Sequence, residues 1–319
     1  MVENAPVLAM QHAGLTIEGF SRAAVQTYWR IPELKLGFDL GGQPWEFMGT
    51  PTWFMSHVHI DHMVSLPQYV ARRRMMKMEP PIVYAPAYAI DDLRRLLLVV
   101  QRLDRCRMLC DLRGLEPDQE ITLSRDHVIT TVAVSHTIPA LGFVVWDRKM
   151  KLKEEFLGLP GPQIRDLKFQ GVEITREIRT PILAYTGDTN PEGIDSNPVF
   201  FQAKILITEM SFVRHNHKRS KVHKFGHMHL DDFVERADRF QNELVICGHA
   251  STRYLPEEIR KTVEAKIPWA AFPQAAHVRC GLRGLVRYHD NDGSPKGVVG
   301  TSTETQAARM PRLPIDAER

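Results

Sequence analysis

Cysteine is scarce in this chain, with four residues in 319. Cys106 and Cys110 stand four residues apart, a helical spacing that lacks the second pair of a zinc knuckle. Cys247 ends an apolar run and is expected to pack in a core strand. This usage argues against a disulfide scaffold and is typical of a reduced, intracellular protein.

Long apolar runs and a targeting segment are also missing. The run Leu96–Val100 is far too short to cross a bilayer, which takes about 20 apolar residues. The first residues, Met1–Pro6, lack the charged region and apolar stretch of a signal peptide. We therefore expect a cytoplasmic protein without a membrane partner, although the sequence leaves an organelle address open.

A large net charge is the third absence, since the formal charge is +3 and the pI is about 8.6. Nucleic-acid binding would therefore depend on local patches. Two segments are candidates for phosphate contacts, Arg72–Arg74 with Lys77, and Arg214–Lys224. The competing interpretation is a solvated helix face for the first and a solvated loop for the second.

Apolar residues make up 43% of the chain, enough for a sizeable core. Their periodicity predicts strands alternating with amphipathic helices, which is typical of a mixed α/β sandwich with helices outside two sheets. The strands are expected at Leu34–Leu40 and Pro81–Pro86, and the helices at Ile90–Leu103, Leu230–Phe240 and Pro256–Lys266. Few apolar residues follow His289, so we expect one domain over residues 1–288 and a flexible tail over 289–319.

One segment stands out for its chemistry, the H-x-H-x-D-H cluster that follows the apolar run Trp53–Met55. It places His57, His59, Asp61 and His62 within six residues. The two first histidines alternate at strand spacing, and the last two residues come where the backbone turns. Imidazole nitrogens and a carboxylate suit zinc, and such a set leaves room for an activated water. A histidine-rich polar turn is the alternative.

This cluster resembles the opening motif of the metallo-β-lactamase superfamily, and the likeness extends from about residue 12 to about residue 285. The resemblance implies an αββα sandwich and three later ligands, His136, Asp188 and His249, each of which follows a β-rich apolar run. By resemblance, one metal would be held by His57, His59 and His136, the other by Asp61, His62 and His249, and Asp188 would bridge them.

Such a pair of zinc ions would support hydrolysis. Two divalent cations about 4 Å apart can share a hydroxide that attacks a phosphodiester and can clamp the leaving oxygen. Zinc-bound water has a pKa of about 7, so no strong side-chain base is required. Asp61 could also orient the water. The ligand set indicates a binuclear metallohydrolase but does not select the substrate.

Four further segments resemble ribonuclease Z, the endonuclease family that removes the 3′ trailer of precursor tRNA. Ser135–Phe143 resembles its His-x-x-Pro-Ser-x-Gly-Tyr segment, with Ala140 and Phe143 as departures. Gly161 and Pro162 lie in a segment, about 150–175, that resembles the arm that grips tRNA; an ordinary proline-stopped loop is the alternative. The run Gly248–Tyr254 resembles the end motif, in which Arg253 would contact substrate.

The fourth segment implies a proton relay to the leaving oxygen, made of Glu209 and His227. A histidine that titrates near neutrality is a suitable donor. His229, at strand spacing from His227, is the second candidate, whereas His215 and His217 are expected in a mobile basic loop.

Three interpretations remain from the sequence. The first is a zinc-dependent tRNA 3′-processing endonuclease, for which the resemblance implies a homodimer. The second is a small-molecule metallohydrolase of the same fold, such as a phosphodiesterase or an arylsulfatase-like enzyme. The third is a binding or scaffold protein without activity, which the full ligand set disfavours. The arm and the Glu209–His227 pair favour the first over the second, because a small substrate needs no grip on a tRNA elbow.

Overall fold

The computed structural model describes residues 5–267, 277–280, 288–289 and 295–296. The chain divides into two compact units, Met1–Val286 and Arg287–Arg319. The described part of the second unit is a two-stranded ladder, β15 (Tyr288–His289) with β16 (Pro295–Lys296). Most of the tail predicted over 289–319 lies outside the described residues, so that prediction stays open.

Two seven-stranded sheets form the first unit. The order within the first sheet follows the chain from β1 to β7. Its strands β1 to β4 pair antiparallel, and β4 to β7 pair parallel. The bounds are β1 (Leu8–His12), β2 (Leu15–Arg22), β3 (Gln26–Ile31), β4 (Leu36–Phe38), β5 (Thr52–Phe54), β6 (Ile82–Pro86) and β7 (Asp111–Leu115).

The second sheet has the order β14-β13-β12-β11-β10-β9-β8. Its strands β8 to β11 pair antiparallel, and β11 to β14 pair parallel. The bounds are β8 (Glu120–Thr122), β9 (His127–Val134), β10 (Ala140–Leu152), β11 (Thr175–Tyr185), β12 (Ile205–Glu209), β13 (Leu244–Gly248) and β14 (His277–Cys280).

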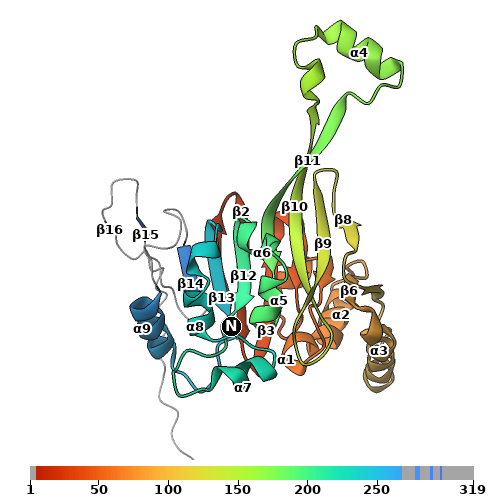
Figure 1. Ribbon diagram of the computed structural model, residues 1–319. Helices are drawn as coiled ribbons and strands as arrows, with labels where there is room; N and C mark the ends of the chain where they lie inside the picture. Colours follow the sequence, from red (N-terminus) through yellow and green to blue (C-terminus); the bar gives the residue numbers. More distant parts are fainter. Residues whose placement is uncertain (1–4, 268–276, 281–287, 290–294, 297–319) are drawn as a thin grey trace, which may run out of the picture. The chain divides into compact units, whose positions relative to one another are not determined.

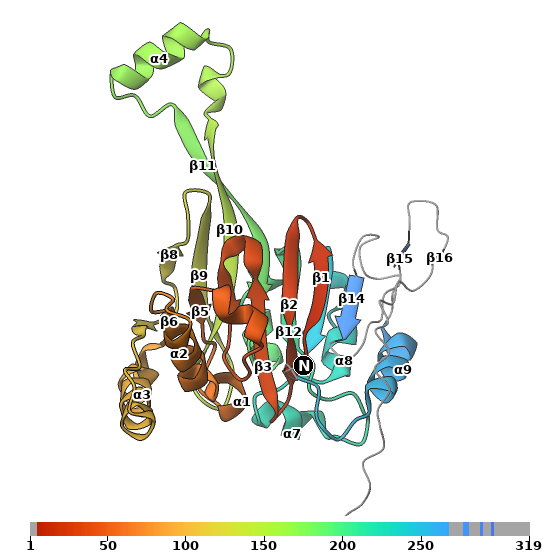
Figure 2. The same cartoon turned by 180° about the vertical axis from the view of Figure 1, so that it is seen from behind.

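Helices cover the outer face of each sheet (Figures 1 and 2). Three apolar clusters separate the layers: one between the sheets, around Phe38 and Phe143, one under α2 and α3, around Trp53, and one under α6, α8 and α9, around Phe233. The helices are α1 (Ile60–Met63), α2 (Leu66–Met75), α3 (Ile90–Asp104), α4 (Gly161–Phe169), α5 (Pro191–Asp195), α6 (Val199–Gln202), α7 (Arg219–Lys224), α8 (Leu230–Val234) and α9 (Pro256–Lys266). The predicted αββα sandwich is confirmed.

The hairpin of β10 and β11 extends beyond the sheet and carries a helical tip (Figure 1). Its strands stay paired out to Leu152 and Thr175, and the tip holds a 3₁₀ turn, η4 (Glu154–Phe156), and α4. We call residues 149–178 the arm. Gly161 and Pro162 begin α4, where proline is favoured because a first-turn N–H has no helical partner.

Several element predictions are confirmed and others are wrong in length. The helix at Pro256–Lys266 has the predicted bounds, and α3 ends one residue later than predicted. The helix expected over Leu230–Phe240 ends at Val234, and a 3₁₀ turn, η5 (Ala237–Arg239), follows. The strand expected over Leu34–Leu40 is confined to β4, because Lys35 and Asp39 have left-handed backbone angles. Among the described residues no helix has the length and apolar character to cross a membrane.

Candidate metal centre

The seven predicted ligands meet at one edge of the two sheets. His57 and His59 lie in the loop after β5, and Asp61 and His62 lie on α1. β5 ends at Phe54, so these two histidines lie beyond the strand, and His57 Nε2 lies 3.1 Å from His59 Nδ1. The other three, His136, Asp188 and His249, follow the ends of β9, β11 and β13. Carboxyl ends of parallel strands share one edge, so distant segments meet there.

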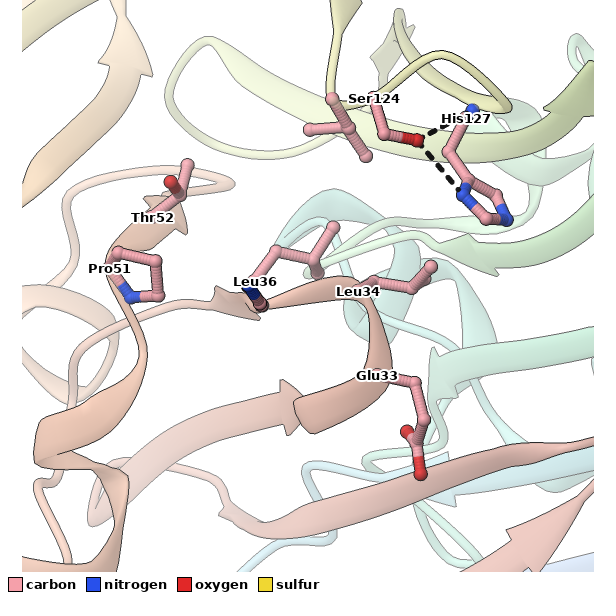
Figure 3. Close-up of a pocket in the computed structure, with 9 residues that line it drawn as sticks. Glu33, Leu34, Leu36, Pro51, Thr52, Ser124 and His127 are labelled. Carbon is pink, nitrogen blue, oxygen red and sulfur yellow. Dashed lines mark hydrogen bonds between the residues drawn. The ribbon is translucent and has the colours of Figure 1, made fainter.

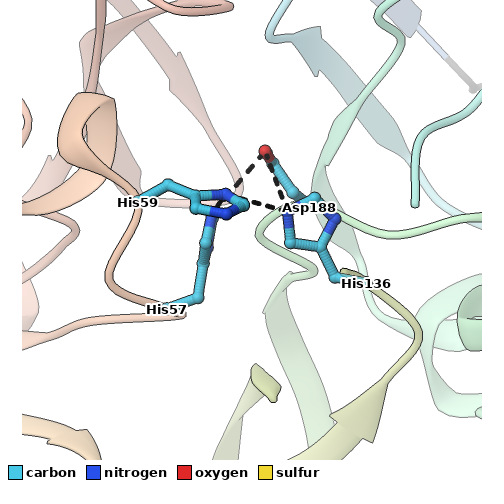
Figure 4. A group of neighbouring side chains, drawn as sticks. All are labelled: His57, His59, His136 and Asp188. Carbon is cyan, nitrogen blue, oxygen red and sulfur yellow. Dashed lines mark hydrogen bonds and ion pairs between the residues drawn. The ribbon is translucent and has the colours of Figure 1, made fainter. Parts of the chain in front are cut away.

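Three imidazole nitrogens face one another in the first group. His59 Nδ1 lies 3.1 Å from His57 Nε2 and 3.1 Å from His136 Nε2. The Asp188 carboxylate completes the group (Figure 4), with Oδ2 3.8 Å and 3.9 Å from those two Nε2 atoms. Donors around a tetrahedral metal ion such as zinc lie about 3.3 Å apart. The imidazole nitrogens are close to this spacing, the Asp188 oxygen lies somewhat further away, and the four together could hold a metal ion.

A second group lies on the other side of Asp188. His249 Nε2 lies 3.3 Å from Asp61 Oδ2 and 3.2 Å from Asp188 Oδ2. His62 Nε2 lies 3.5 Å from Asp188 Oδ1. The two oxygens of Asp188 thus face members of both groups, as a bridging carboxylate requires.

Hydrogen bonds to the Nδ1 atoms fix the tautomers of His57 and His62. Ser56 Oγ donates to Asp39 Oδ2 at 2.8 Å, so it accepts from His57 Nδ1 at 2.9 Å. Asp39 also accepts from His62 Nδ1 at 2.8 Å and from the Tyr185 hydroxyl. With their Nδ1 protons engaged, both imidazoles turn the Nε2 lone pair towards the centre, which is the ligating form.

The second sheet repeats this arrangement. Ser211 Oγ donates to Glu209 Oε2 at 2.5 Å and accepts from His249 Nδ1 at 2.9 Å. His136 Nδ1 donates to the Gly226 carbonyl oxygen at 2.9 Å. A Cβ at Gly226 would lie 2.5 Å from His136 Nδ1, so this contact requires glycine.

The sheets approach each other closely beside Asp188. A Cβ at Gly187 would lie 2.5 Å from Ser56 Cβ, and the φ of 60° is also one that glycine favours. His249 has a φ of 58°, a strained value for a residue with a side chain. Such strain is common where surrounding structure holds a residue in place for function.

The electrostatics suit cations. Burial alone would raise the pKa of Asp61, but its hydrogen bond to His249 and the nearby His62 lower that pKa to about 2. Burial also opposes ionisation of Asp188, yet His249 and His62 hold its pKa well below the ordinary value. Burial lowers the pKa of His57, of His59 and of His136. Ionised carboxylates and the neutral imidazoles of His57, His59 and His136 are the forms that bind metals.

One buried atom lacks a partner at the centre. His62 Nε2 makes no hydrogen bond among the described residues, although the side chain is fully buried. Burial lowers its pKa, but the Asp188 and Asp39 carboxylates raise the pKa of His62 well above its ordinary value. A metal cation bound here would displace the Nε2 proton of His62 and give that nitrogen a partner. The residues present therefore fit metal binding.

Glu209 and His227 lie beside the first group. Glu209 Oε1 accepts from His227 Nδ1 at 3.0 Å and from the Thr189 N–H at 2.8 Å. The Met228 N–H also donates to Glu209, whose side chain is buried. Although burial lowers it, the Glu209 carboxylate raises the pKa of His227 to about 9. The imidazole is thus held, oriented and favoured in its protonated form.

The competing histidines have other surroundings. His229 is buried and caps α8: its Nδ1 accepts from the Asp231 N–H at 3.0 Å, and its Nε2 donates to the Arg214 carbonyl at 2.9 Å. Both ring nitrogens are therefore engaged in structure. His217 lies beside Phe212 and Tyr254, and His215 is largely exposed.

Predicted RNA-binding residues lie outside the centre. Gly161 and Pro162 lie on the arm, and Arg253 is an exposed residue just after the His249 loop. In the basic segment of α2, Arg73 is buried and donates to the carbonyls of Met48 and Glu79. A phosphate contact from Arg73 is therefore excluded.

The second basic segment is partly neutralised as well. Arg214 pairs with Glu258, and Arg219 pairs with Asp232 and Glu235. Because these guanidiniums have partners, the segment offers fewer free cations than its sequence indicates.

Asp39, Ser56 and Ser211 orient ligand side chains and were not predicted from the sequence. Asp39 directly follows the apolar strand β4, as His249 directly follows β13. That signal was available. The two serines carry no comparable pattern, because their role depends on which carboxylate folds next to them.

Comparisons with known proteins agree with this geometry. A profile described as "Beta-lactamase superfamily domain" matches residues 52–250. The chain is 36% identical to tRNase Z TRZ1 of Arabidopsis thaliana, over 82% of this chain and 94% of that protein. It is 34% identical to the chloroplastic tRNase Z TRZ2 of the same plant, over 77% of this chain and 70% of that one.

A solved structure resembles the fold. The metallo-β-lactamase fold protein YhfI of Bacillus subtilis is 14% identical, with a TM-score of 0.57, over 84% of this chain and 95% of that one. The match to two plant relatives along most of their length, together with the ligand edge described above, is the basis for the assignment. The chain belongs to the ribonuclease Z family of the metallo-β-lactamase superfamily.

Proposed function

We propose that this protein is a zinc-dependent endoribonuclease that removes the 3′ trailer of precursor tRNA. The proposal rests on one observation. Two groups of candidate metal ligands lie at the same edge of the sheets as His227, a candidate proton donor that is hydrogen-bonded to Glu209. The relatives named tRNase Z supply the substrate class. The alternative, a small-molecule metallohydrolase, has no use for the arm.

The donor atoms would divide between two zinc ions. His57, His59 and His136 would hold one, and Asp61, His62 and His249 the other, because Asp188 faces members of both groups. When bound, the pair supplies an activated water and stabilises charge on the phosphate. Asp61, held by the Ala24 N–H at 2.7 Å, would also accept a hydrogen bond from that water and orient it.

His227 would protonate the leaving 3′ oxygen. Glu209 holds the Nδ1 side, so the Nε2 side is free to face the substrate. General acid catalysis contributes about 10²–10⁴-fold, which is the share we assign to His227.

The arm and Arg253 would bind the tRNA body. Exposed basic residues, among them Lys151, Arg165 and Lys168, occur along the arm, and Gly161 with Pro162 starts its helix. Phosphate contacts of this kind make affinity depend on salt.

We also propose a homodimer, supported by exposed apolar side chains on α3. Leu98, Val99 and Leu103 are 53%, 52% and 79% exposed. Leu103→Glu should shift the protein towards the monomer in analytical ultracentrifugation, whereas Arg102→Glu on the same helix serves as the control. An unchanged sedimentation coefficient at Leu103→Glu would place the interface elsewhere.

Cytoplasmic action is proposed from the scarcity of cysteine, which is typical of reduced compartments: Cys106 and Cys110 form no disulfide among the described residues. One relative is named chloroplastic, so a fluorescent fusion of the full chain is the test. Signal confined to an organelle would contradict the proposal.

Cleavage of a precursor tRNA beside bis(p-nitrophenyl) phosphate tests the function. The metal-loaded protein should release the trailer at one bond, and removal of metal by a chelator should stop both reactions until zinc is restored. Hydrolysis of the small ester without any cleavage of precursor tRNA would favour the small-molecule hydrolase.

A further inference from the structure

Two surface pockets lie near opposite ends of the strands. One, of about 340 Å³, lies at the amino ends of β4 and β5, where Leu36 and Thr52 face the Ser124–His127 turn (Figure 3). The ligands follow the carboxyl ends of those strands, so this pocket is remote from the metal centre. The other, of about 320 Å³, opens at the edge of the sheets that carries the ligands, where β6, β7 and β9 end.

The second pocket is joined directly to the catalytic edge. Its wall includes Pro139, in the short loop that also carries His136, and Ala140 and Leu141 at the start of β10. The Leu141 N–H donates to the Ser56 carbonyl at 2.9 Å, which ties this wall to the residue before His57. The pocket and the ligand His136 therefore share one loop.

Its lining is mostly apolar. Pro86 and Leu115 in this lining are buried, and it also includes Pro117, Pro139 and Tyr88, which is 50% exposed. A Cβ at Gly114 would lie 3.1 Å from Ala87 Cα, so glycine lets the Tyr88 turn lie close against β7. This close approach places Tyr88 in the lining of the pocket.

The chemistry of the lining selects the ligand. No lysine, arginine or histidine lines the pocket among the described residues, so it does not suit a phosphate. An exposed aromatic ring with proline faces suits a planar group, and stacking of bases on aromatic rings is the common way to bind single-stranded RNA. Glu116, the one carboxylate in the lining, can accept a hydrogen bond from an exocyclic amino group.

We propose that this pocket binds one unpaired base of the RNA beside the scissile phosphate, stacked on Tyr88. The inference rests on the proposed endonuclease function and adds a residue that positions the strand for cleavage. A base held there fixes the rotation of the backbone at the neighbouring phosphate, so the bond to be cut faces the metal centre.

The test measures KM and kcat for precursor tRNA with the wild type, Tyr88→Ala and Tyr88→Phe. Loss of one stacked base costs about tenfold in affinity, so Tyr88→Ala should raise KM about tenfold, and Tyr88→Phe, which keeps the ring, should not. Precursors with an abasic nucleotide on either side of the scissile bond identify the base. One of these two abasic precursors should have a higher KM than the intact precursor with the wild type. With Tyr88→Ala the same abasic precursor should raise KM no further.

Failure of this inference differs from failure of the function. If Tyr88→Ala cleaves precursor tRNA with the wild-type KM, or if its effect adds fully to that of both abasic substrates, the pocket does not bind a base. A parallel loss with bis(p-nitrophenyl) phosphate would place the damage at the metal centre and would also overturn the inference. If the wild type does not cleave precursor tRNA, the proposed function itself is wrong.

Discussion

The strands β10 and β11 join two regions with opposite properties. At the metal-centre end, Phe143, Val144 and Val145 are fully buried between layers. At the arm end, Met150 is 58% exposed, Phe169 is 84% exposed, and α4 has no buried residue. The same hairpin is thus a rigid support at one end and an open surface at the other.

Polar contacts differ in the same way. The metal-centre carboxylates Asp39 and Glu209 are buried, and each accepts several hydrogen bonds. The arm holds exposed ion pairs such as Lys153–Glu173 and Arg176–Glu154, which contribute little stability. Chemistry requires donor atoms placed within a fraction of an Å. Contact with a large RNA requires reach, and it tolerates motion.

The largest effect is expected at the bridging carboxylate. Asp188→Ala should abolish hydrolysis of every substrate, and the metal content by elemental analysis should fall below two equivalents, because Asp188 faces both groups. His62→Ala should behave alike. Asp91→Ala, at an exposed aspartate on α3, is the control. If Asp188→Ala keeps its full zinc content and normal turnover, Asp188 does not bridge the two metal sites.

His227→Ala should lower kcat for precursor tRNA by about 10²–10⁴-fold and leave RNA affinity in place. The loss should be smaller with bis(p-nitrophenyl) phosphate, because p-nitrophenolate leaves without a proton. His229→Asn is the matched control, since asparagine keeps an acceptor for capping α8. If the control shows the substrate-selective loss instead, His229 is the donor.

The same residue predicts a pH dependence. The pKa of His227 is raised to about 9, so the proton donor is present at neutral pH and is lost as pH rises through that value. Bound cations repel the imidazolium, so the alkaline limb of kcat is expected at or below about pH 9. His227→Ala should remove this limb. A limb that persists unchanged in the variant would belong to another group.

Loss of the arm should affect binding more than chemistry. Leu152 and Thr175 are paired across the hairpin, so an Asn-Gly turn can replace residues 153–174 without breaking the sheet. We expect the KM for precursor tRNA to rise about tenfold or more, as salt-dependent phosphate contacts are lost. If the arm deletion impairs hydrolysis of bis(p-nitrophenyl) phosphate as much as cleavage of precursor tRNA, the arm is part of the structural core and not a binding element.

The smallest effect is expected for stability at the arm. Phe169→Ser should change the free energy of unfolding by less than about 0.5 kcal/mol, because the side chain is exposed. Phe143→Ala, at the other end of the hairpin, should cost about 3–5 kcal/mol. Urea denaturation of both variants checks the contrast, and a large loss at Phe169 would mean that the arm packs against another surface.

Local sequence determined the parts of the site that depend on neighbours in the chain. His57, His59, Asp61 and His62 fall within one loop and one helical turn, so their spacing alone brings them together. The helix over Pro256–Lys266 was also predictable, because an amphipathic pattern and a first-turn proline are local signals.

The tertiary structure decided how distant residues meet and which charges remain free. Asp39 and Ser56 orient His57 and His62 only because β4 and β5 are paired, and pairing is not encoded in either segment alone. Arg73 stands in a basic run, yet packing of α2 directs it to buried carbonyls. The sequence of the basic run cannot reveal which arginine is buried, because a buried arginine and a solvated one are the same residue type.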